Sequence, residues 1–442
     1  MRPAVRLTLF CLALPCLCVP LAQAQGLIPR TTATRYGLER AWFAQVGSAQ
    51  VNGPLQYVNY DEGMVLLQSS RGMLTALDAE TGRTLWSTQI GSREGGSSEP
   101  AANDKHVVVL NGSTLFVVDR KDGGIVWQKQ VRGAPGSGPG VTATHAFVPM
   151  ASGVVEGYDL AAGTKQTPWN YQSTGRVLVP PMTTVSTVSW TTDKGHFYVA
   201  DPKAGGIKYR LESRGAMHAR PASWSPMLFS TSVDGFVYAI EENKGAIKWK
   251  YSVGHPIYTQ PVAIENRVFV IPEFGDMYCL DSKTGDLVWH APGIKQFVSA
   301  SPTRVYAADE LGRIEMLDLE TGARVGTLPV SGLTKKLVNT TSDRIFLVDG
   351  SNVVQCLHET QLNTPVLHTP PKPVAEEDLR LKPKKPSTAA PEEPAEATPA
   401  AEKPADATTD PPADDGSSPF DAPADANDAP AADAGGNPFD TP

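Results

Sequence analysis

The sequence lacks the short motifs that mark common catalytic and metal-binding sites. It has no H-E-x-x-H or C-x-x-C metal signature and no G-x-S-x-G nucleophile elbow. The glycine-rich stretch GAPGSGPG around Ser137 lacks the Lys-Ser/Thr ending of a phosphate-binding loop. The eight histidines include no close pair, so shared metal ligation would require side chains from distant parts of the chain. We therefore expect no metal ion and no catalytic residues built on these motifs.

The N-terminal stretch MRPAVRLTLFCLALPCLCVPLAQAQG has the composition of a secretory signal peptide. Arg2 and Arg6 precede an apolar run that closes on the small-x-small sequence A-Q-A. This pattern predicts a signal peptide over residues 1–24 and export of the mature chain. An uncleaved anchor is the alternative, but the run is short for a membrane span and contains two prolines. A lipid anchor is disfavoured because Cys16 and Cys18 follow proline and leucine rather than a small residue.

The net charge of −8 is concentrated at the C-terminal end of the chain. From Pro371 onward the sequence has 16 acidic and 6 basic residues, whereas the segment between the signal peptide and Pro371 is neutral. A neutral body with an acidic tail provides no basic surface for nucleic acid or for an anionic membrane.

The tail itself, residues 366–442, is rich in Pro, Ala, Asp and Glu. Such a segment buries too little apolar surface to offset its ordering entropy, so we predict that it is disordered. Two Pro-Phe-Asp triplets occur in it, at Phe420 and Phe439. They are either a pair of short docking motifs on an acidic tether or incidental aromatic residues in a solvated spacer.

The main positive feature of the sequence is a repeat of about forty residues. The stretches DAETGRTLW, DRKDGGIVW, EENKGAIKW and DSKTGDLVW share an acid, a glycine four residues later and a tryptophan eight residues later. Steps of 37 to 42 residues separate the acid positions, which are Asp78, Asp119, Asp159, Asp201, Glu241, Asp281 and Asp318, with His358 in a degenerate last copy. A period of this length is typical of a four-stranded β-propeller blade.

Each part of the repeat has a structural reason. An alternating strand such as GMLTALD ends at the acid, and its period of two presents one face to each neighbouring blade. In the turn that follows, the acid accepts backbone N–H groups one or two residues on, and the glycine adopts a positive φ at little cost. We interpret the tryptophans as packing between blades and not as ligand platforms. Trp169 is displaced by a two-residue insertion, and Tyr209 and Gly326 replace the tryptophan in two copies.

Two strands at the ends of the repeat region have no partner in this scheme. LERAWFAQVG around Trp42 resembles the strand after an acid turn, whereas NVVQCLHE around Cys356 resembles the strand before one. Joining them predicts an all-β fold, an eight-bladed β-propeller over residues 37–360 that is closed by a blade shared between both ends. Such closure removes the open sheet edge. We expect the strand of Trp42 to pair with the strand that contains residues 354–357.

Cysteine is scarce outside the predicted signal peptide, where only Cys279 and Cys356 remain. An exported chain could oxidise such a pair. Both residues stand two positions before the acid position of their copies, where other copies have small or apolar core residues. Equivalent positions two blades apart cannot approach to the Cα separation of about 4.4–6.8 Å that a disulfide needs. We therefore predict two free thiols.

The unit acid-x-x-x-Gly-x-x-x-Trp after a YAL-like strand resembles the repeat of pyrroloquinoline-quinone-type β-propellers, over residues 40–358. In the quinoprotein alcohol dehydrogenases of that superfamily, the funnel binds the quinone with calcium, and the chain is longer and has adjacent cysteines. This chain has no Cys-Cys pair. In size, repeat and predicted export it is more similar to the non-catalytic propeller subunit of the outer-membrane β-barrel assembly machinery. It differs from that subunit in its acidic tail and in lacking a clear lipidation site.

Candidate binding residues lie where the innermost strands of the propeller begin. In six repeats a proline marks this start, and the side chains just before it should face one mouth of the central channel. We select Glu99, Arg220 and Gln260, which directly precede prolines, and His218 and Tyr258, which stand two residues earlier. Polar groups that converge on a concavity form the default ligand or partner site. The alternative is that they only solvate a water-filled channel.

Together these features favour an exported, non-catalytic scaffold that binds protein partners in the periplasm or cell envelope. We expect a monomer that associates with a membrane only through its partners. The resemblance implies a role in outer-membrane protein assembly. The alternative function is a quinone-binding oxidoreductase with PQQ and calcium in the funnel. The missing Cys-Cys pair and the lack of a matched set of carboxylates favour the scaffold, without a cofactor.

Overall fold

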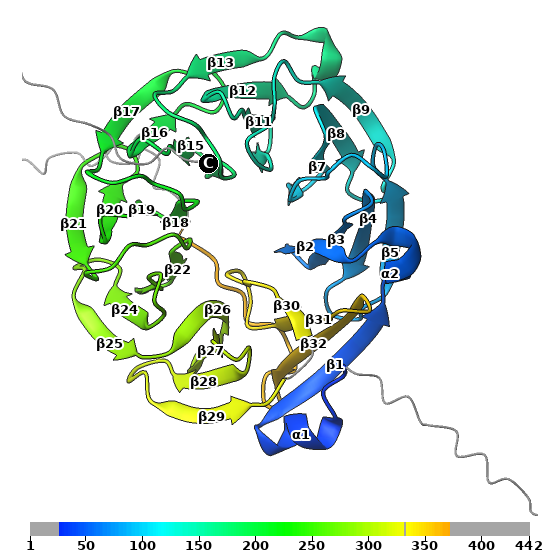
Figure 1. Ribbon diagram of the computed structural model, residues 1–442, viewed down its shortest axis with the longest axis vertical. Helices are drawn as coiled ribbons and strands as arrows, with labels where there is room; N and C mark the ends of the chain where they lie inside the picture. The colour runs from blue at the N-terminus through cyan, green and yellow to red at the C-terminus, as the bar shows by residue number, and fades with distance from the viewer. Residues whose placement is uncertain (1–25, 331–332, 372–442) are drawn as a thin grey trace, which may run out of the picture. The chain divides into compact units, whose positions relative to one another are not determined.

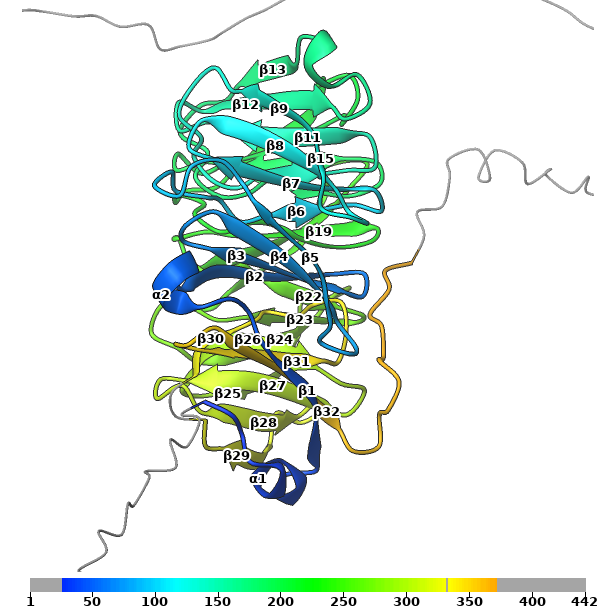
Figure 2. The ribbon, with the colours of Figure 1, turned by 90° about the vertical axis from the view of Figure 1, so that its right-hand side faces the viewer.

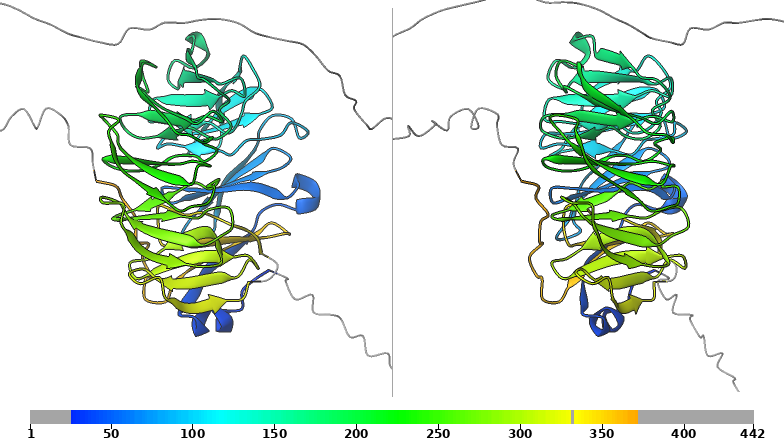
Figure 3. Two further views of the ribbon diagram at one scale, coloured as in Figure 1. Left: turned by 60° about the vertical axis from the view of Figure 1, so that its left-hand side comes forward. Right: turned by 90° about the vertical axis from the view of Figure 1, so that its left-hand side faces the viewer.

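The computed structural model describes residues 26–330 and 333–371, which form eight four-stranded sheets arranged around a central axis (Figure 1). Paired strands are antiparallel in every sheet. Seen from the side, the ring is a short disc, with the helices α1 (Arg30–Arg35) and α2 (Ala49–Asn52) on its outer rim (Figure 2, Figure 3). The predicted eight-bladed β-propeller is confirmed.

The first four blades each run from an innermost to an outermost strand in chain order. Blade 1 comprises β2 (Leu55–Asp61), β3 (Met64–Ser69), β4 (Met73–Asp78) and β5 (Thr84–Gln89). Blade 2 comprises β6 (Ala101–Ala102), β7 (His106–Asn111), β8 (Thr114–Asp119) and β9 (Ile125–Gln130). Blade 3 comprises β10 (Gly140–Val141), β11 (His145–Pro149), β12 (Val154–Asp159) and β13 (Trp169–Gln172). Blade 4 comprises β14 (Met182–Thr183), β15 (Val188–Thr191), β16 (His196–Ala200) and β17 (Ile207–Glu212).

The last four blades follow the same plan until the chain returns to its start. Blade 5 comprises β18 (Ala222–Trp224), β19 (Met227–Thr231), β20 (Phe236–Glu241) and β21 (Ile247–Ser252). Blade 6 comprises β22 (Val262–Ile264), β23 (Arg267–Val270), β24 (Met277–Asp281) and β25 (Leu287–Ala291). Blade 7 comprises β26 (Ile294–Ala300), β27 (Arg304–Asp309), β28 (Ile314–Asp318) and β29 (Arg324–Leu328). Blade 8 comprises β30 (Leu333–Lys336), β31 (Ile345–Asp349), β32 (Val353–Glu359) and β1 (Leu38–Gln45).

Blade 8 takes its outermost strand from the N-terminal part of the chain (Figure 1). Trp42 of β1 lies opposite Cys356 of β32, and Ala44 lies opposite Val354. The predicted closure is therefore confirmed. The two thiols are free and buried, as predicted: Cys356 is in blade 8 and Cys279 is in blade 6.

Adjacent blades are joined by the tryptophan of one repeat and the turn of the next. Trp249 of blade 5 donates its indole N–H to the carbonyl of Ser282 in blade 6, at 3.0 Å. Its ring covers Gly285, where an added Cβ would lie 2.6 Å from Cδ2 of Trp249. The same donation to a turn carbonyl recurs for Trp42 to Ala79, Trp86 to Arg120, Trp127 to Leu160, Trp169 to Pro202, Tyr209 to Glu242 and Trp289 to Leu319. These aromatic residues are structural, as interpreted from the sequence.

In six of the repeat turns an aspartate carboxylate accepts backbone N–H groups of the turn, whereas Glu241 pairs with Lys244 and Lys248. The Asp281 carboxylate accepts the N–H groups of Lys283 at 2.8 Å and Thr284 at 2.9 Å, which are two and three residues on. The N–H two residues on was expected, whereas the N–H three residues on was not, because the turn is wider than expected. The Thr284 N–H stabilises the charged form and lowers the pKa of Asp281 against the opposing effect of partial burial.

Two departures from the repeat are absorbed locally. The insertion before Trp169 forms a short 3₁₀ turn, η1 (Gly163–Lys165), after which Trp169 takes its normal place opposite Gly157. Blade 7 has Gly326 where a tryptophan is expected, and the ring of Tyr36 lies beside that glycine. Tyr36 follows α1 and packs on a core shared by blades 7 and 8 that includes Ile28. The segment before residue 37 therefore completes the ring.

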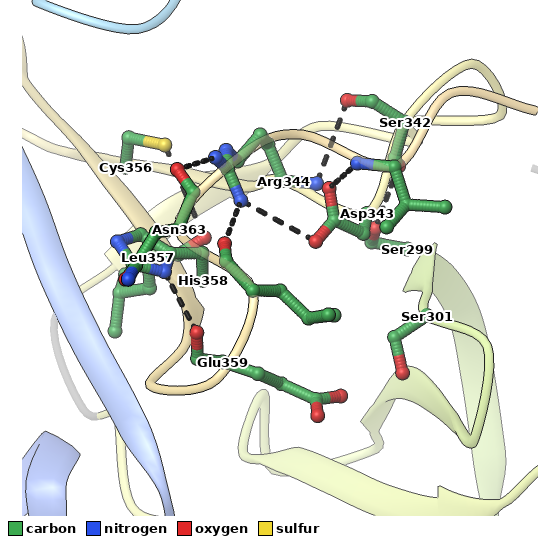
Figure 4. A network of polar contacts seen from close by, with 12 residues as sticks. Ser299, Ser301, Ser342, Asp343, Arg344, Cys356, Leu357, His358, Glu359 and Asn363 are labelled. Carbon is green, nitrogen blue, oxygen red and sulfur yellow. Dashed lines mark hydrogen bonds and ion pairs between the residues drawn. The ribbon is translucent and has the colours of Figure 1, made fainter.

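A buried arginine fastens the chain beyond β32 to the ring. Arg344 is 1% exposed, and its guanidinium donates to the carbonyls of Leu362 at 2.9 Å and Asn363 at 3.0 Å. It also pairs with the carboxylates of Glu80 in blade 1 and of Asp343, which lies beside it in Figure 4. Burial raises the pKa of Asp343, against the opposing effects of a backbone N–H and of Arg344.

Contacts with the ring continue past residue 360, the predicted end of the propeller. Val366 donates its N–H to Asp343, and the His368 imidazole lies 3.0 Å from the carbonyl oxygen of Ala300. Residues 360–371 run along one face of the disc (Figure 2). The predicted signal peptide and the predicted docking motifs at Phe420 and Phe439 lie outside the described residues.

The contact between tryptophan and glycine predicts different stability effects at two neighbouring glycines. Gly205 has a φ of +67°, and an added Cβ would lie 2.5 Å from Cδ2 of Trp169. Gly205→Ala should lower the free energy of unfolding, measured by urea denaturation, by more than about 1 kcal/mol. Gly206→Ala is the control, because its Cβ would meet nothing within 4 Å. Equal losses in the two variants would show that the Trp169 contact is not important.

The network at Arg344 predicts a large stability loss when this one buried residue is replaced. Arg344→Leu leaves the Asp343 carboxylate, 2% exposed, without its cation and should cost about 3–5 kcal/mol in denaturant unfolding. Arg176→Leu is the control, because it removes an even shorter ion pair, 2.7 Å from Asp193, at a side chain that is 63% exposed. Its cost should stay below about 1 kcal/mol. A small loss at Arg344 would contradict the role of this network in closing the ring.

Candidate binding channel

The innermost strands enclose a polar channel along the ring axis. Its main cavity has a volume of about 500 Å³, and an adjoining cavity has about 210 Å³. The main cavity is lined by Gln56, Tyr57, Val58, Asn59, Tyr60, Glu99, Arg220, Gln260, Gln296, Thr334, Lys335, Lys336, Leu337, Val338 and Thr340. A space of this size in a rigid ring can hold a small ligand or a segment of a partner.

Three of the five residues selected from the sequence lie together in this lining: Glu99, Arg220 and Gln260. Glu99 accepts a hydrogen bond from the side-chain amide of Asn59 at 2.9 Å. Arg220 forms no hydrogen bond or ion pair with any residue that the structure describes, and its Nε is buried without a partner. The channel therefore contains a guanidinium whose hydrogen-bonding capacity is open to a ligand.

The electrostatics of the channel depend on how far its lining residues are shielded from water. Burial lowers the pKa of Arg220, while the charge of Glu99 partly opposes the shift. Burial also raises the pKa of Tyr57, and Glu99 adds to that effect. Arg220 and Tyr57 are both partly shielded from water, so an anion that enters interacts with Arg220 more strongly than it would in water.

The other two selected residues are not part of the cavity lining. The rings of His218 and Tyr258 stack on each other, with centroids 6.1 Å apart and planes inclined by 20°. Tyr258 is 47% exposed. They lie in the loops that lead into blades 5 and 6, next to the channel residues in the chain. The role of all five residues in partner binding stays a prediction.

The sequence analysis missed lining residues on the inner strands of blades 8 and 1. Lys335 and Lys336 come from β30, and Tyr57 and Asn59 come from β2. Blade 8 has no proline before its inner strand, although counting back about twenty residues from His358 reaches this segment. Blade 1 does have such a marker in Pro54, directly before β2.

The channel lining does not fit a quinone site with calcium. Calcium takes about six to eight oxygen ligands, usually with several carboxylates among them. Of the two carboxylates along the channel cavities, Glu99 accepts from Asn59 and Asp61 is paired with Arg120. No group of three His, Cys, Asp or Glu side chains within the described part of the chain could hold a metal ion. We therefore derive no step through such a cofactor.

Arg120, which is buried, and Arg220, which is partly buried in the channel wall, differ in a way that predicts different stability effects. Arg120 pairs with Asp61 and donates to the carbonyls of Asp61, Asn103 and Glu62. Arg120→Met should therefore lower the free energy of unfolding by more than about 2 kcal/mol. Arg220→Met removes a confined charge without bonded partners and should leave stability within about 0.5 kcal/mol, or raise it. Thermal and urea unfolding of both variants would check this, and an equal loss would assign Arg220 a structural role.

Comparisons with known proteins agree with this architecture. The family model of the outer membrane protein assembly factor BamB matches residues 39–167, 111–227 and 194–364. None of the curated protein sequences matches the chain significantly. Among residues 26–330 and 333–371, no helix is long and apolar enough to cross a membrane.

Solved structures share the fold at low sequence identity. BamB from Moraxella catarrhalis is 15% identical with a TM-score of 0.59, and the match covers 73% of this chain and 98% of that chain. The computationally designed Ika8 protein is 16% identical with a TM-score of 0.57, over 69% and 96% of the two chains. The C-terminal WD40 domain of Sif2 is 11% identical with a TM-score of 0.55, over 73% and 98%. These likenesses concern the fold, but the overlapping family matches extend from residue 39 to residue 364, and the chain belongs to the family of the outer membrane protein assembly factor BamB.

Proposed function

We propose that this protein is an exported, non-catalytic scaffold that binds protein partners in the cell envelope and contributes to outer-membrane protein assembly. The observation that carries the proposal is the family membership over residues 39–364. The signal peptide predicted at residues 1–24 supports export to the periplasm. The proposal includes no cofactor.

The loops next to the channel support a binding role. Tyr258 is 47% exposed and Phe274 is 67% exposed. The ring of Phe274 packs edge-on against His255, with centroids 5.4 Å apart. The N–H of Glu273 donates to the carbonyl of Pro256 at 2.9 Å, so the two loops support each other. Exposed aromatic side chains held by fixed loops are typical of the central contacts in protein interfaces.

The proposal predicts that channel-side residues contribute to binding and not to stability. Arg220→Ala and Tyr258→Ala combined should weaken partner capture from envelope extracts by about tenfold, measured by quantitative mass spectrometry. The thermal midpoint should stay nearly unchanged, because Arg220 has no bonded partner among the described residues and Tyr258 is exposed, and such changes usually alter stability by no more than about 0.5 kcal/mol.

The control variant is Val185→Ala, at a valine that is 85% exposed and lines neither channel cavity. It should capture partners as the unmodified protein does. Unchanged capture by the folded double variant would move the binding site elsewhere on the protein. Saturable binding of added quinone with calcium, followed by absorption, would contradict a non-catalytic scaffold.

A further inference from the structure

An apolar pocket opens beside the channel, between blades 6 and 7. Its volume is about 270 Å³, and its apolar lining consists of Val262, Phe269, Ile271, Phe297 and Val338. Phe269 and Phe297 are almost wholly buried, and their ring centroids are 5.4 Å apart. The walls are therefore part of the packed core, and the pocket is preformed for an apolar group.

The pocket and the channel cavity are adjacent and share part of their lining. Gln260, Gln296 and Val338 line both spaces. The Gln296 side-chain amide donates to the Lys336 carbonyl at 2.9 Å, which fixes Gln296 beside the inner strand of blade 8. A single ligand that spans this shared lining would contact the apolar pocket and the polar channel at the same time.

Where the pocket and the channel meet, which we call the junction, cations outnumber carboxylates. The main cavity is lined by three cations, Arg220, Lys335 and Lys336, and by one carboxylate, Glu99, which already accepts from Asn59. Among the described residues, none of the three cations has an ion pair within 4.0 Å.

Lys336 is partly buried, and this affects its charge. Burial lowers its pKa, while the Asp309 carboxylate partly opposes the shift. The cation of the apolar pocket, Lys295, is by contrast neutralised by Glu310 at 3.1 Å. The unpaired cations, which are Arg220, Lys335 and Lys336, therefore lie on the channel side of the shared lining.

We propose that the channel and the apolar pocket together bind an amphiphilic carboxylate, with its apolar group in the pocket and its carboxylate at Arg220 and Lys336. A guanidinium can bind both carboxylate oxygens, which adds geometric specificity to the charge attraction. This chemistry has two sources: a free aromatic or aliphatic acid, and an apolar residue at the free C-terminus of a polypeptide. The site goes beyond the scaffold function, which does not require it.

The first experiment titrates the purified full-length protein with 3-phenylpropionate by isothermal titration calorimetry. We expect saturable binding at one site. 3-Phenylpropanol keeps the apolar group without the charge, and propionate keeps the charge without the ring. Each should bind at least about tenfold more weakly. Equal binding of the alcohol and the acid, or no saturable binding of the acid, would overturn the proposal.

Variants locate the site. Arg220→Gln and Lys336→Gln should each weaken 3-phenylpropionate binding by about tenfold, and Val338→Glu should abolish it by placing a carboxylate at the junction. Val185→Glu makes the same chemical change at an exposed valine that lines none of these cavities and should leave binding unchanged. Unchanged affinity in folded Arg220→Gln and Lys336→Gln would overturn the assignment. If a variant fails to fold, the ligand series on the unmodified protein decides.

A peptide pair distinguishes the two sources. A hexapeptide that ends in phenylalanine with a free carboxylate is compared with the same peptide carrying a C-terminal amide. Tighter binding of the free carboxylate would assign the site to chain ends, and binding of 3-phenylpropionate alone would assign it to small acids. Partner capture is measured in parallel. Intact capture without any carboxylate binding would overturn this inference and leave the scaffold function standing.

Discussion

The ring depends on one contact that is repeated between neighbouring blades. An aromatic side chain on the outermost strand of one blade donates a hydrogen bond to a turn carbonyl of the next blade and covers the glycine of that turn. Trp249, Ser282 and Gly285 form one example. The aromatic side chain occupies the space that a Cβ at the glycine would need. Its indole N–H donates to a carbonyl that packing shields from water. Glycine and tryptophan therefore share a period because each turn receives the tryptophan of the copy before it.

This dependence explains why the two ends of the repeat region must meet. The contact between blades 8 and 1 is made by Trp42, which comes from the N-terminal strand and donates to Ala79. It exists only when β1 is paired with β32. The junction between blades 7 and 8 has no tryptophan, because Gly326 stands in its place, and there Tyr36 and the core around Ile28 supply the packing. Closure therefore uses residues on both sides of the predicted boundary at residue 37.

The period of the repeat was enough to predict the fold, because each copy contains the turn, the strand and the aromatic residue of one unit. The prolines also located Glu99, Arg220 and Gln260 in the channel. His218 and Tyr258 do not line the main cavity, and their place at the channel mouth stays a prediction. They precede β18 and β22 in loops, and residues in loops do not alternate between faces as residues in strands do. Lys335 and Lys336 have no local marker, since their position depends on how the last blade is closed.

Three arginines of the ring separate stability from binding. Arg120 and Arg344 donate to carbonyls and pair with carboxylates of the fold. Their charges therefore contribute to stability. Arg220 stands on the channel wall without such partners. A confined, unpaired charge is unfavourable in the free protein, so the fold gains nothing from it. The contacts between blades stabilise the ring from outside the channel. The fold therefore tolerates the unpaired Arg220 in the lining, where its guanidinium is available for an anionic group.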